Sequence, residues 1–174
     1  MIDWKNISFE NLAGYISEQL RQEGIETVLV GGACVTIYSK NRYQSYDLDF
    51  VTYEDVKKVR NVLINLGFKE KSGCFRHEDC PWFVEFVSPP VAIGNEPVEK
   101  LNTLETPLGM IKMLSPTDSV KDRLSAYYHW DDTQTLDQAV QICQEQAVDI
   151  KDVERWSERE EMSEKLQVFL SRLS

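Results

Sequence analysis

The chain has 174 residues, of which 42% are hydrophobic and 28% are charged, and its formal net charge is −10. This composition fits one globular domain, or one domain with a helical extension, and excludes wholesale disorder. The negative charge argues against broad, nonspecific binding to nucleic acids or anionic membranes. No apolar run approaches the roughly 20 residues of a membrane helix, and residues 1–5 lack a signal-peptide profile. We therefore expect a cytoplasmic protein without membrane association.

The first part of the chain predicts a helix followed by a strand, a turn and a second helix. The first helix is expected after Ser8, a good N-cap, because apolar residues then recur at helical spacing. Residues 28–30 predict a short buried strand, which Gly31 and Gly32 follow at once. Glycine lets the backbone turn sharply and approach a ligand closely. A helix starting near residue 33 would aim its free N–H groups at the same place, which suits a phosphate.

A polar, basic loop then leads to a pair of aspartates. The loop contains Arg42 and ends at Ser45, and each side chain could contact a phosphate or simply be solvated. On the strand that follows, Asp47 and Asp49 point to one face, while the apolar residues beside them point to the other. Carboxylate pairs of this kind bind Mg²⁺, usually together with substrate phosphates.

The order of these pieces resembles the DNA polymerase β-like nucleotidyltransferase superfamily. Its signature is an apolar residue, Gly, then Gly or Ser, a spacer, and two acids that alternate with apolar residues. The corresponding residues here are Val30-Gly31-Gly32 and Asp47-Leu48-Asp49-Phe50, with a slightly longer spacer than the commonest form. The resemblance implies transfer of a nucleoside monophosphate from a nucleoside triphosphate. It also implies two Mg²⁺ ions at the aspartates and phosphates seated at the glycines.

The next stretch predicts a second strand–helix unit, a hairpin and a third acid. A helix is expected between a cap at Thr52 and Gly67, and residues 68–78 predict a hairpin. Residues 82–87 predict a buried strand whose single charge is Glu85. A buried lone carboxylate is costly unless it meets a cation or another partner. The superfamily carries its third metal-binding acid on a later strand, so the resemblance implies that role for Glu85; a salt-bridged or edge-strand glutamate is the alternative.

The four cysteines are expected to be free thiols in a cytosolic chain. Cys74, His77 and Cys80 form a Cys-x-x-His-x-x-Cys cluster. Zinc would need a fourth ligand and a more usual spacing there, and a hairpin with two buried thiols is the alternative.

From Ser115 onwards the hydrophobic period becomes helical. Ser115 and Pro116 give a cap followed by proline at the first helical position. We expect a C-terminal helical region over residues 115–174, packed on a nucleotidyltransferase-like core over residues 1–114. The expected fold class is therefore α/β (α+β), with a short mixed sheet, helices on one side and a C-terminal helical bundle.

The C-terminal region resembles that of stand-alone nucleotidyltransferases of the abortive-infection toxin type. Those enzymes have a lysine in the helix after the sheet and an acid near the next helix. The resemblance implies that Lys121 contacts phosphates and that Asp132, or else Asp137, occupies the later acid position. Surface pairing of Lys121 with neighbouring acids is the alternative. The same resemblance implies a toxin–antitoxin pair, with an antitoxin as partner.

The sequence leaves the acceptor of the reaction open. A tRNA end, a protein hydroxyl and a small molecule such as an aminoglycoside all fit the chemistry, although the net charge of −10 weighs against long nucleic acids. A catalytically inert module of the same fold, which binds nucleotides or another protein, is the alternative function.

Overall fold

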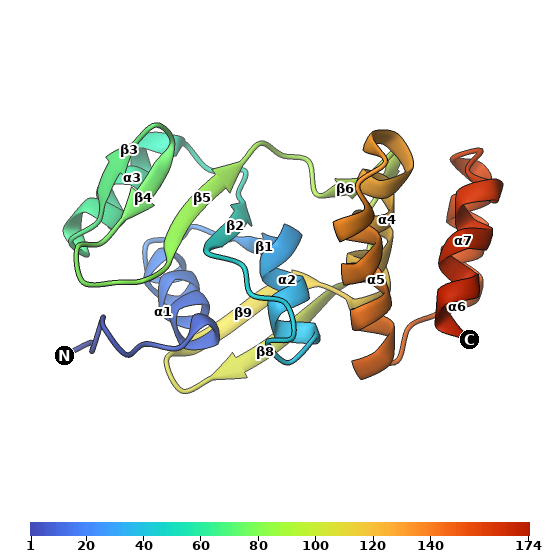
Figure 1. Ribbon diagram of the computed structural model, residues 1–174. Helices are drawn as coiled ribbons and strands as arrows, with labels where there is room; N and C mark the ends of the chain where they lie inside the picture. The colour runs from blue at the N-terminus through green and yellow to red at the C-terminus, as the bar shows by residue number, and fades with distance from the viewer.

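The computed structural model describes all 174 residues as a mixed α/β fold (Figure 1). The helices are α1 (Phe9–Gln22), α2 (Gly31–Tyr38), α3 (Val56–Asn65), α4 (Pro116–Trp130), α5 (Thr133–Glu145), α6 (Ile150–Arg159) and α7 (Ser163–Leu173). The strands are β1 (Val28–Val30), β2 (Asp47–Val51), β3 (Lys69–Lys71), β4 (Cys74–Arg76), β5 (Phe83–Val87), β6 (Ala92–Ile93), β7 (Glu96–Pro97), β8 (Leu101–Thr106) and β9 (Gly109–Leu114).

Seven of the strands form one mixed sheet in the order β3-β4-β5-β2-β1-β9-β8, and β6 pairs with β7 as a separate hairpin. The pairs β2–β5 and β1–β9 are parallel, and the other pairs in the sheet are antiparallel. The expected fold class is confirmed. None of the helices combines the length and the apolar character that a membrane crossing requires.

Capping residues define where several helices begin. The hydroxyl of Ser8 accepts a hydrogen bond from the first turn of α1, and that of Ser115 does the same for α4, as expected. The cap of α3 is Asp55 and not Thr52, which corrects the expectation. Asp55 accepts from the backbone N–H of Lys57 at 2.8 Å, whereas the Thr52 hydroxyl donates to the carbonyl of Glu26 at 2.8 Å. Thr52 therefore ties the end of β2 to the segment before β1.

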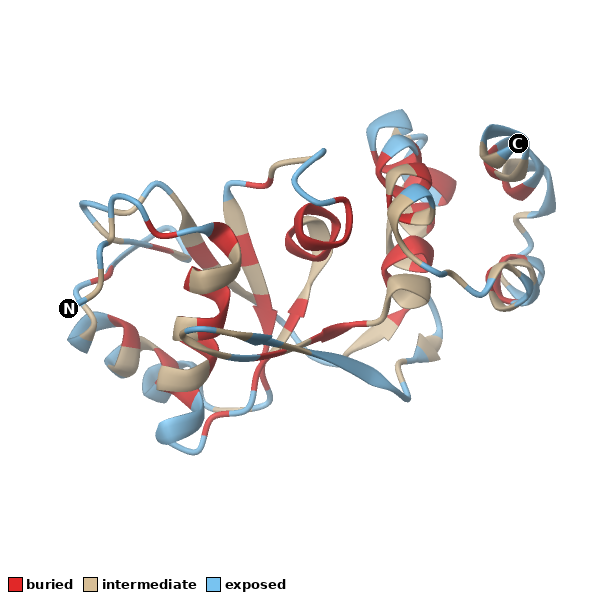
Figure 2. Cartoon of the chain, turned by 90° about the horizontal axis from the view of Figure 1, so that it is seen from below, coloured by how far each residue is buried: buried red, intermediate tan, exposed pale blue.

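Helix α2 connects the sheet to the C-terminal helices. It packs on β1 and β2 on one side and on α4 and α5 on the other. Figure 2 shows it buried along nearly its whole length, from Ala33 to Tyr38. The start of α2 is thus held between the sheet and α4.

One hydrophobic core joins the sheet to the C-terminal helices. It includes Leu12 of α1, Leu48 of β2 and Trp156 of α6. The β6–β7 hairpin precedes residue 114 but packs on α4, and the indole N–H of Trp156 donates to the carbonyl of Ile93 at 3.4 Å. The division at residue 114 stays a prediction, and this hairpin crosses it in space.

Candidate metal and nucleotide site

Three carboxylates come together on neighbouring strands. Asp47 and Asp49 lie on β2, and Glu85 lies on β5, directly opposite Asp49 in the parallel register. One oxygen atom from each carboxylate lies within 4.8 Å of the other two. The role expected for Glu85 required its strand to lie beside that of the aspartates, and the pairing of β5 with β2 brings all three acids together.

The alternation of strand residues explains why these acids share a face. Leu48 of β2 is paired with Val84 of β5, and both are fully buried on the opposite face of the sheet. Burial of these apolar groups fixes the register, because a slip by one residue would turn the carboxylates into the core. The hydrophobic core therefore determines where the acids point.

Asp49 is the acid most affected by this crowding. Burial, and then the charges of Asp47 and Glu85, raise the pKa of Asp49 to about 7. Ionised carboxylates held this close repel one another, so a bound proton or cation stabilises them. Three carboxylate oxygens on a half-buried face are the donor set that a hard cation such as Mg²⁺ prefers. The residues therefore fit the expected metal.

The raised pKa of Asp49 predicts that Mg²⁺ and protons compete. Below about pH 7 we expect Mg²⁺ affinity to fall by about tenfold per pH unit, because a proton must leave Asp49 before the metal binds. Calorimetric titration of Mg²⁺ between about pH 5 and pH 8 would measure this slope. An affinity that does not change below about pH 7 would contradict the prediction.

The raised pKa of Asp49 also makes the free energy of unfolding depend on pH when no metal is bound. The pKa of Asp49 is higher in the folded protein than the unfolded value of about 3.9, so the unfolded state loses its proton first. The free energy of unfolding should therefore fall as pH rises from about 4 to 7, by at most about 1.4 kcal/mol per unit. We expect the stability of Asp49→Asn relative to the native protein to rise between about pH 5 and pH 8 in urea unfolding with EDTA. If the difference in the free energy of unfolding between Asp49→Asn and the native protein were the same at both pH values, the prediction would be contradicted.

Gly31 and Gly32 bring the start of α2 against the carboxylates. Gly31 has a φ of +64°, and a Cβ atom there would lie 2.9 Å from Oδ2 of Asp49. Glycine is therefore the residue that allows this turn. Helix α2 begins directly after β1, and no side chain caps it. Its first N–H groups can therefore bind an anion next to the three acids.

Ser45 lies beside Asp47 and orients it. Its hydroxyl donates to Oδ1 of Asp47 at 2.7 Å, and its backbone N–H donates to the hydroxyl of Thr36 on α2 at 2.9 Å. Ser45 is only 4% exposed, and a Cβ atom on Gly32 would lie 3.4 Å from its hydroxyl. The structure thus brings the two glycines, Ser45 and the carboxylates into one site. Direct phosphate contact by Ser45 stays a prediction.

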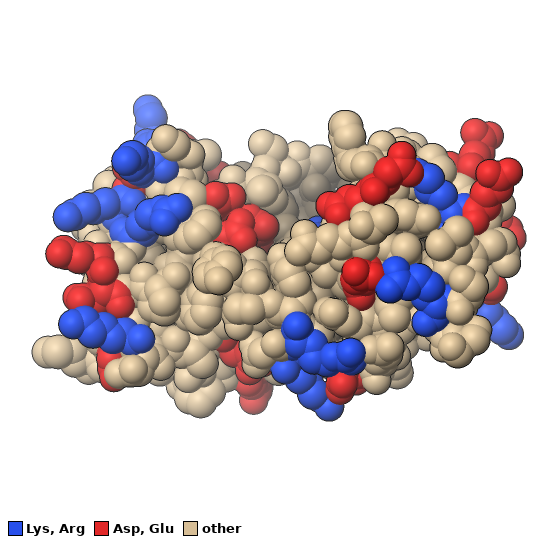
Figure 3. Space-filling model, in the orientation of Figure 1, with Lys and Arg blue, Asp and Glu red and all other residues tan.

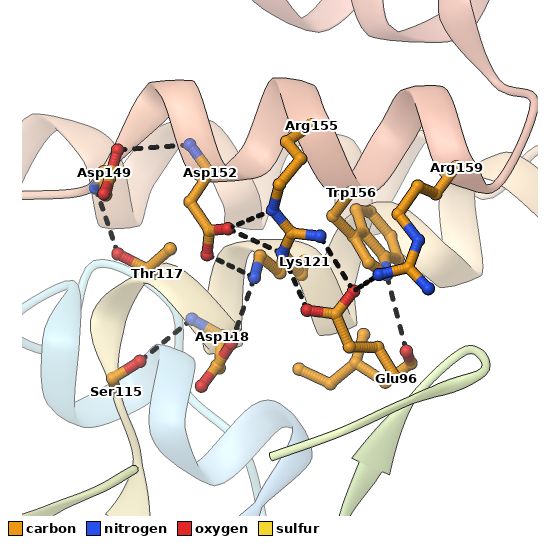
Figure 4. Close-up of polar contacts among 11 residues, drawn as sticks. Glu96, Ser115, Thr117, Asp118, Lys121, Asp149, Asp152, Arg155, Trp156 and Arg159 are labelled. Carbon is orange, nitrogen blue, oxygen red and sulfur yellow. Dashed lines mark hydrogen bonds and ion pairs between the residues drawn. The ribbon is translucent and has the colours of Figure 1, made fainter. Parts of the chain in front are cut away.

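Lys121 lies elsewhere, on the face of α4 that meets α6. Its side chain is 5% exposed, and its ammonium pairs with Asp152 at 2.5 Å and with Asp118 at 3.5 Å. Figure 4 shows these pairs in a larger network that includes Arg155 and Glu96. Phosphate contact by Lys121 therefore stays a prediction that would require these ion pairs to break.

Asp132 also has a structural partner. It is the N-cap of α5, and its carboxylate accepts from the backbone N–H groups of Gln134 and Thr135 at 2.9 and 3.3 Å. The alternative acid, Asp137, pairs with Arg172 at 2.5 Å. Neither acid belongs to the group of three carboxylates, and their suggested nucleotide roles stay predictions.

We expect Lys121→Met to affect stability more than nucleotide binding. The free energy of unfolding should fall by about 2 kcal/mol, less than for a fully buried pair, because Asp152 is 33% exposed and keeps Arg155 as a partner. Lys151→Met, on the exposed side of α6, is the matched control and should change little. Urea unfolding and nucleotide titration of both variants would test this. A loss of nucleotide affinity at unchanged stability would instead assign Lys121 to the phosphates.

The sequence reasoning gave no site role to Arg123 of α4, a cation whose charge acts on Asp49. The positive charge of Arg123 lowers the pKa of Asp49, and the negative charge of Asp122 raises it, so this edge of α4 lies near Asp49. Arg123 is 18% exposed and pairs with Asp122 at 2.6 Å. Figure 3 shows the surface hollowed between the sheet and the helices α4 and α5. Residues on one helix differ in direction by about 100° per position, so Lys121 and Arg123 cannot both face this hollow.

Cys74 is a second residue that the sequence did not connect to the site. Its thiol donates to Oε1 of Glu85 at 2.7 Å, because Cys74 of β4 lies directly opposite Glu85 in the antiparallel register. His77 instead stacks on Trp4, with ring centres 4.3 Å apart. The three carboxylates are the one group of potential metal ligands in the structure, so the Cys-x-x-His-x-x-Cys cluster does not form a zinc site.

Two solved structures share this fold at low sequence identity. An antigenic nucleotidyltransferase-like protein from Paracoccidioides brasiliensis aligns with a TM-score of 0.57 and 15% identity, over 77% of this chain and 74% of that chain. The antibiotic-resistance factor ANT(2″)-Ia aligns with a TM-score of 0.52 and 12% identity, over 95% of this chain and 94% of that chain. The expected nucleotidyltransferase-like fold is thereby confirmed, and the toxin-like subtype stays a prediction. No protein-family model and no curated protein matches the sequence.

Proposed function

We propose that this chain transfers a nucleoside monophosphate from a nucleoside triphosphate to the hydroxyl group of an acceptor. The acceptor oxygen forms a bond to the α-phosphorus, and the bond from that phosphorus to the bridging oxygen breaks. Pyrophosphate leaves with the bonding electrons, and the hydroxyl proton passes to water. The observation that carries the proposal is the group of three carboxylates within 4.8 Å of one another, beside an uncapped helix start.

The carboxylates would hold two Mg²⁺ ions together with the phosphates of the substrate. Asp47 and Asp49 would be the ligands on β2, and Glu85 would complete the metal site on the side of the acceptor. The chemistry that Mg²⁺ supplies when bound is neutralisation of phosphate charge and activation of the attacking oxygen for an in-line displacement. The hydrogen bond from Ser45 to Asp47 holds that carboxylate in place before the substrate binds.

Other groups would bind the triphosphate from two sides. The N–H groups at the start of α2, exposed by Gly31 and Gly32, would seat the terminal phosphates. Arg123 of α4, whose charge acts on Asp49, would add positive charge. Charge that develops on the phosphates would then be stabilised by groups already in position, which is the usual source of catalysis in this chemistry. The fold shared with a nucleotidyltransferase-like protein supports this proposal.

Calorimetric titration of the four nucleoside triphosphates, each with Mg²⁺ and then with EDTA, tests the proposal on the native protein and on Asp49→Asn. We expect magnesium-dependent binding of at least one nucleotide, and loss of that binding in the variant. Binding without turnover would favour the catalytically inert module. Absence of any nucleotide or Mg²⁺ effect would overturn the proposal. A toxin–antitoxin role rests on the resemblance alone and stays a prediction.

A further inference from the structure

A strip of cations lies on the same face of the sheet as the three carboxylates. Lys69 and Lys71 lie on β3, and Arg76 lies on β4, directly opposite Lys69. Side chains alternate between the two faces of a strand, and directly opposed residues share a face. We call these three residues the basic strip. Glu70, between the two lysines, points to the other face and pairs with Arg60 of α3.

Two rows of cross-strand neighbours lead from the basic strip to the carboxylates. The first row runs through Lys71, Cys74, Glu85 and Asp49, and the second through Lys69, Arg76, Phe83 and Asp47. Neighbouring strands are about 4.8 Å apart, so roughly 10 Å separate Lys71 from Glu85 in the first row and Arg76 from Asp47 in the second. A molecule whose end reaches the metal site can therefore contact the basic strip with a part that lies roughly 10 Å from that end.

The cations of the basic strip have no ion-pair partner. Most Lys and Arg residues of this acidic chain pair with a carboxylate, whereas Lys69, Lys71 and Arg76 pair with none. The guanidinium of Arg76 lies over the ring of Phe83, 4.2 Å from its centre, which holds the charge near the carboxylates. An anionic ligand would therefore gain these contacts without breaking any ion pair.

The basic strip lines a cavity of about 520 Å³. The aromatic residues Trp82 and Phe83 line the same cavity, and Glu78 is the one carboxylate among its lining residues. Figure 3 shows Lys and Arg side chains over the β3–β4 part of the molecule, beside a group of carboxylates. Cations interleaved with aromatic rings are the arrangement that binds single-stranded nucleic acids, through phosphate contacts and base stacking.

We propose that the acceptor is a single-stranded nucleic acid, whose terminal hydroxyl reaches the three carboxylates while its phosphates lie along the basic strip. The inference rests on the proposed function, because it assigns the acceptor of that reaction. The same cations disfavour a positively charged acceptor such as an amino sugar. The net charge of −10 still opposes broad binding to nucleic acids and confines the contact to this strip.

Fluorescence anisotropy with a labelled single-stranded RNA of about 16 nucleotides tests the inference on the full chain. The strip variant is K69Q/K71Q/R76Q. The matched control is K57Q/K100Q/K151Q, which removes the same number of exposed, unpaired charges elsewhere on the surface. We expect the strip variant to bind RNA at least about tenfold more weakly and the control to bind as the native protein does. The slope of log affinity against log salt should become shallower by about two, for three phosphate contacts.

Calorimetric titration of nucleoside triphosphate with Mg²⁺ separates the inference from the proposed function. The strip variant should keep native nucleotide affinity. Equal loss of RNA binding in both variants, or equal loss of nucleotide and RNA binding in the strip variant, would overturn the inference. So would a mononucleotide that competes as well as the RNA, since the acceptor would then be a small anion. If the native protein binds nucleotide but no RNA, the inference fails alone; if it binds neither, the proposed function fails too.

Discussion

Asp49→Asn should reduce nucleotidyl transfer by on the order of a thousandfold or more while the protein stays folded. Asparagine has the size of aspartate but no charge, and Asp49 lies between Asp47 and Glu85 in the proposed metal site. Removing its charge also relieves the cost of burial and then the repulsion that raise its pKa, so stability without metal should not fall. Asp47→Asn should have a similar effect on activity.

The measurement is the release of pyrophosphate with Mg²⁺ present, together with thermal unfolding of each variant. Asp79→Asn is the matched control, because the Asp79 carboxylate is exposed, pairs only with Lys5 at 3.5 Å, and lies outside the site. It should keep native activity. Full activity of Asp49→Asn would refute the mechanism.

Gly14→Ala should lower the free energy of unfolding by about 3 kcal/mol, the largest expected effect on the fold. A Cβ atom on Gly14 of α1 would lie 2.1 Å from the hydroxyl of Thr106 and 2.9 Å from the carbonyl of Gly109. The Thr106 hydroxyl cannot move away freely, because it donates to Gly109 at 2.8 Å and accepts from Leu108 at 3.2 Å. Helix α1 and the β8–β9 turn are thus in backbone contact.

The sign of the change in the free energy of unfolding distinguishes the steric clash of the added methyl group from the higher helix propensity of alanine. In a helix that has room for a methyl group, Gly→Ala stabilises by about 1 kcal/mol, so a stabilised variant would show that the close contact is absent. In thermal unfolding the expected loss corresponds to a decrease in Tm of about 6–12 °C. The double variant Gly14→Ala/Thr106→Ala should recover part of the loss, because it removes the nearer of the two obstructing atoms.

Local patterns predicted much of the fold, because each depends on residues close together in the chain. Ser8 and Ser115 marked helix starts through hydrogen bonds to N–H groups three residues ahead. The cap at Thr52 was wrong, since its hydroxyl donates to Glu26 and accepts from the N–H of Glu54, which precedes the helix, and Asp55 caps α3 instead. The alternation of Asp47 to Phe50 indicated which side chains would share a face.

The composition of the site depended on pairing between distant segments. Glu85 meets Asp49 only because β2 and β5 are adjacent, and a local pattern contains no information on which strands pair. Pairing of β4 with β5 likewise places Cys74 next to Glu85, and pairing of β3 with β4 brings Lys71 of the basic strip into the same row, one strand further.

The sequence by itself determined the glycine turn, the aspartate pair and the positions of the helices that carry positive charge. Only the tertiary structure decided which cations face the carboxylates. Lys121 and Arg123 lie two positions apart on α4, and the packing of that helix between α2 and α6 turns Lys121 to Asp152 and Arg123 to a different side, where its charge acts on Asp49. Rotation of a helix about its axis is fixed by the surfaces that it buries, and those surfaces come from the whole chain.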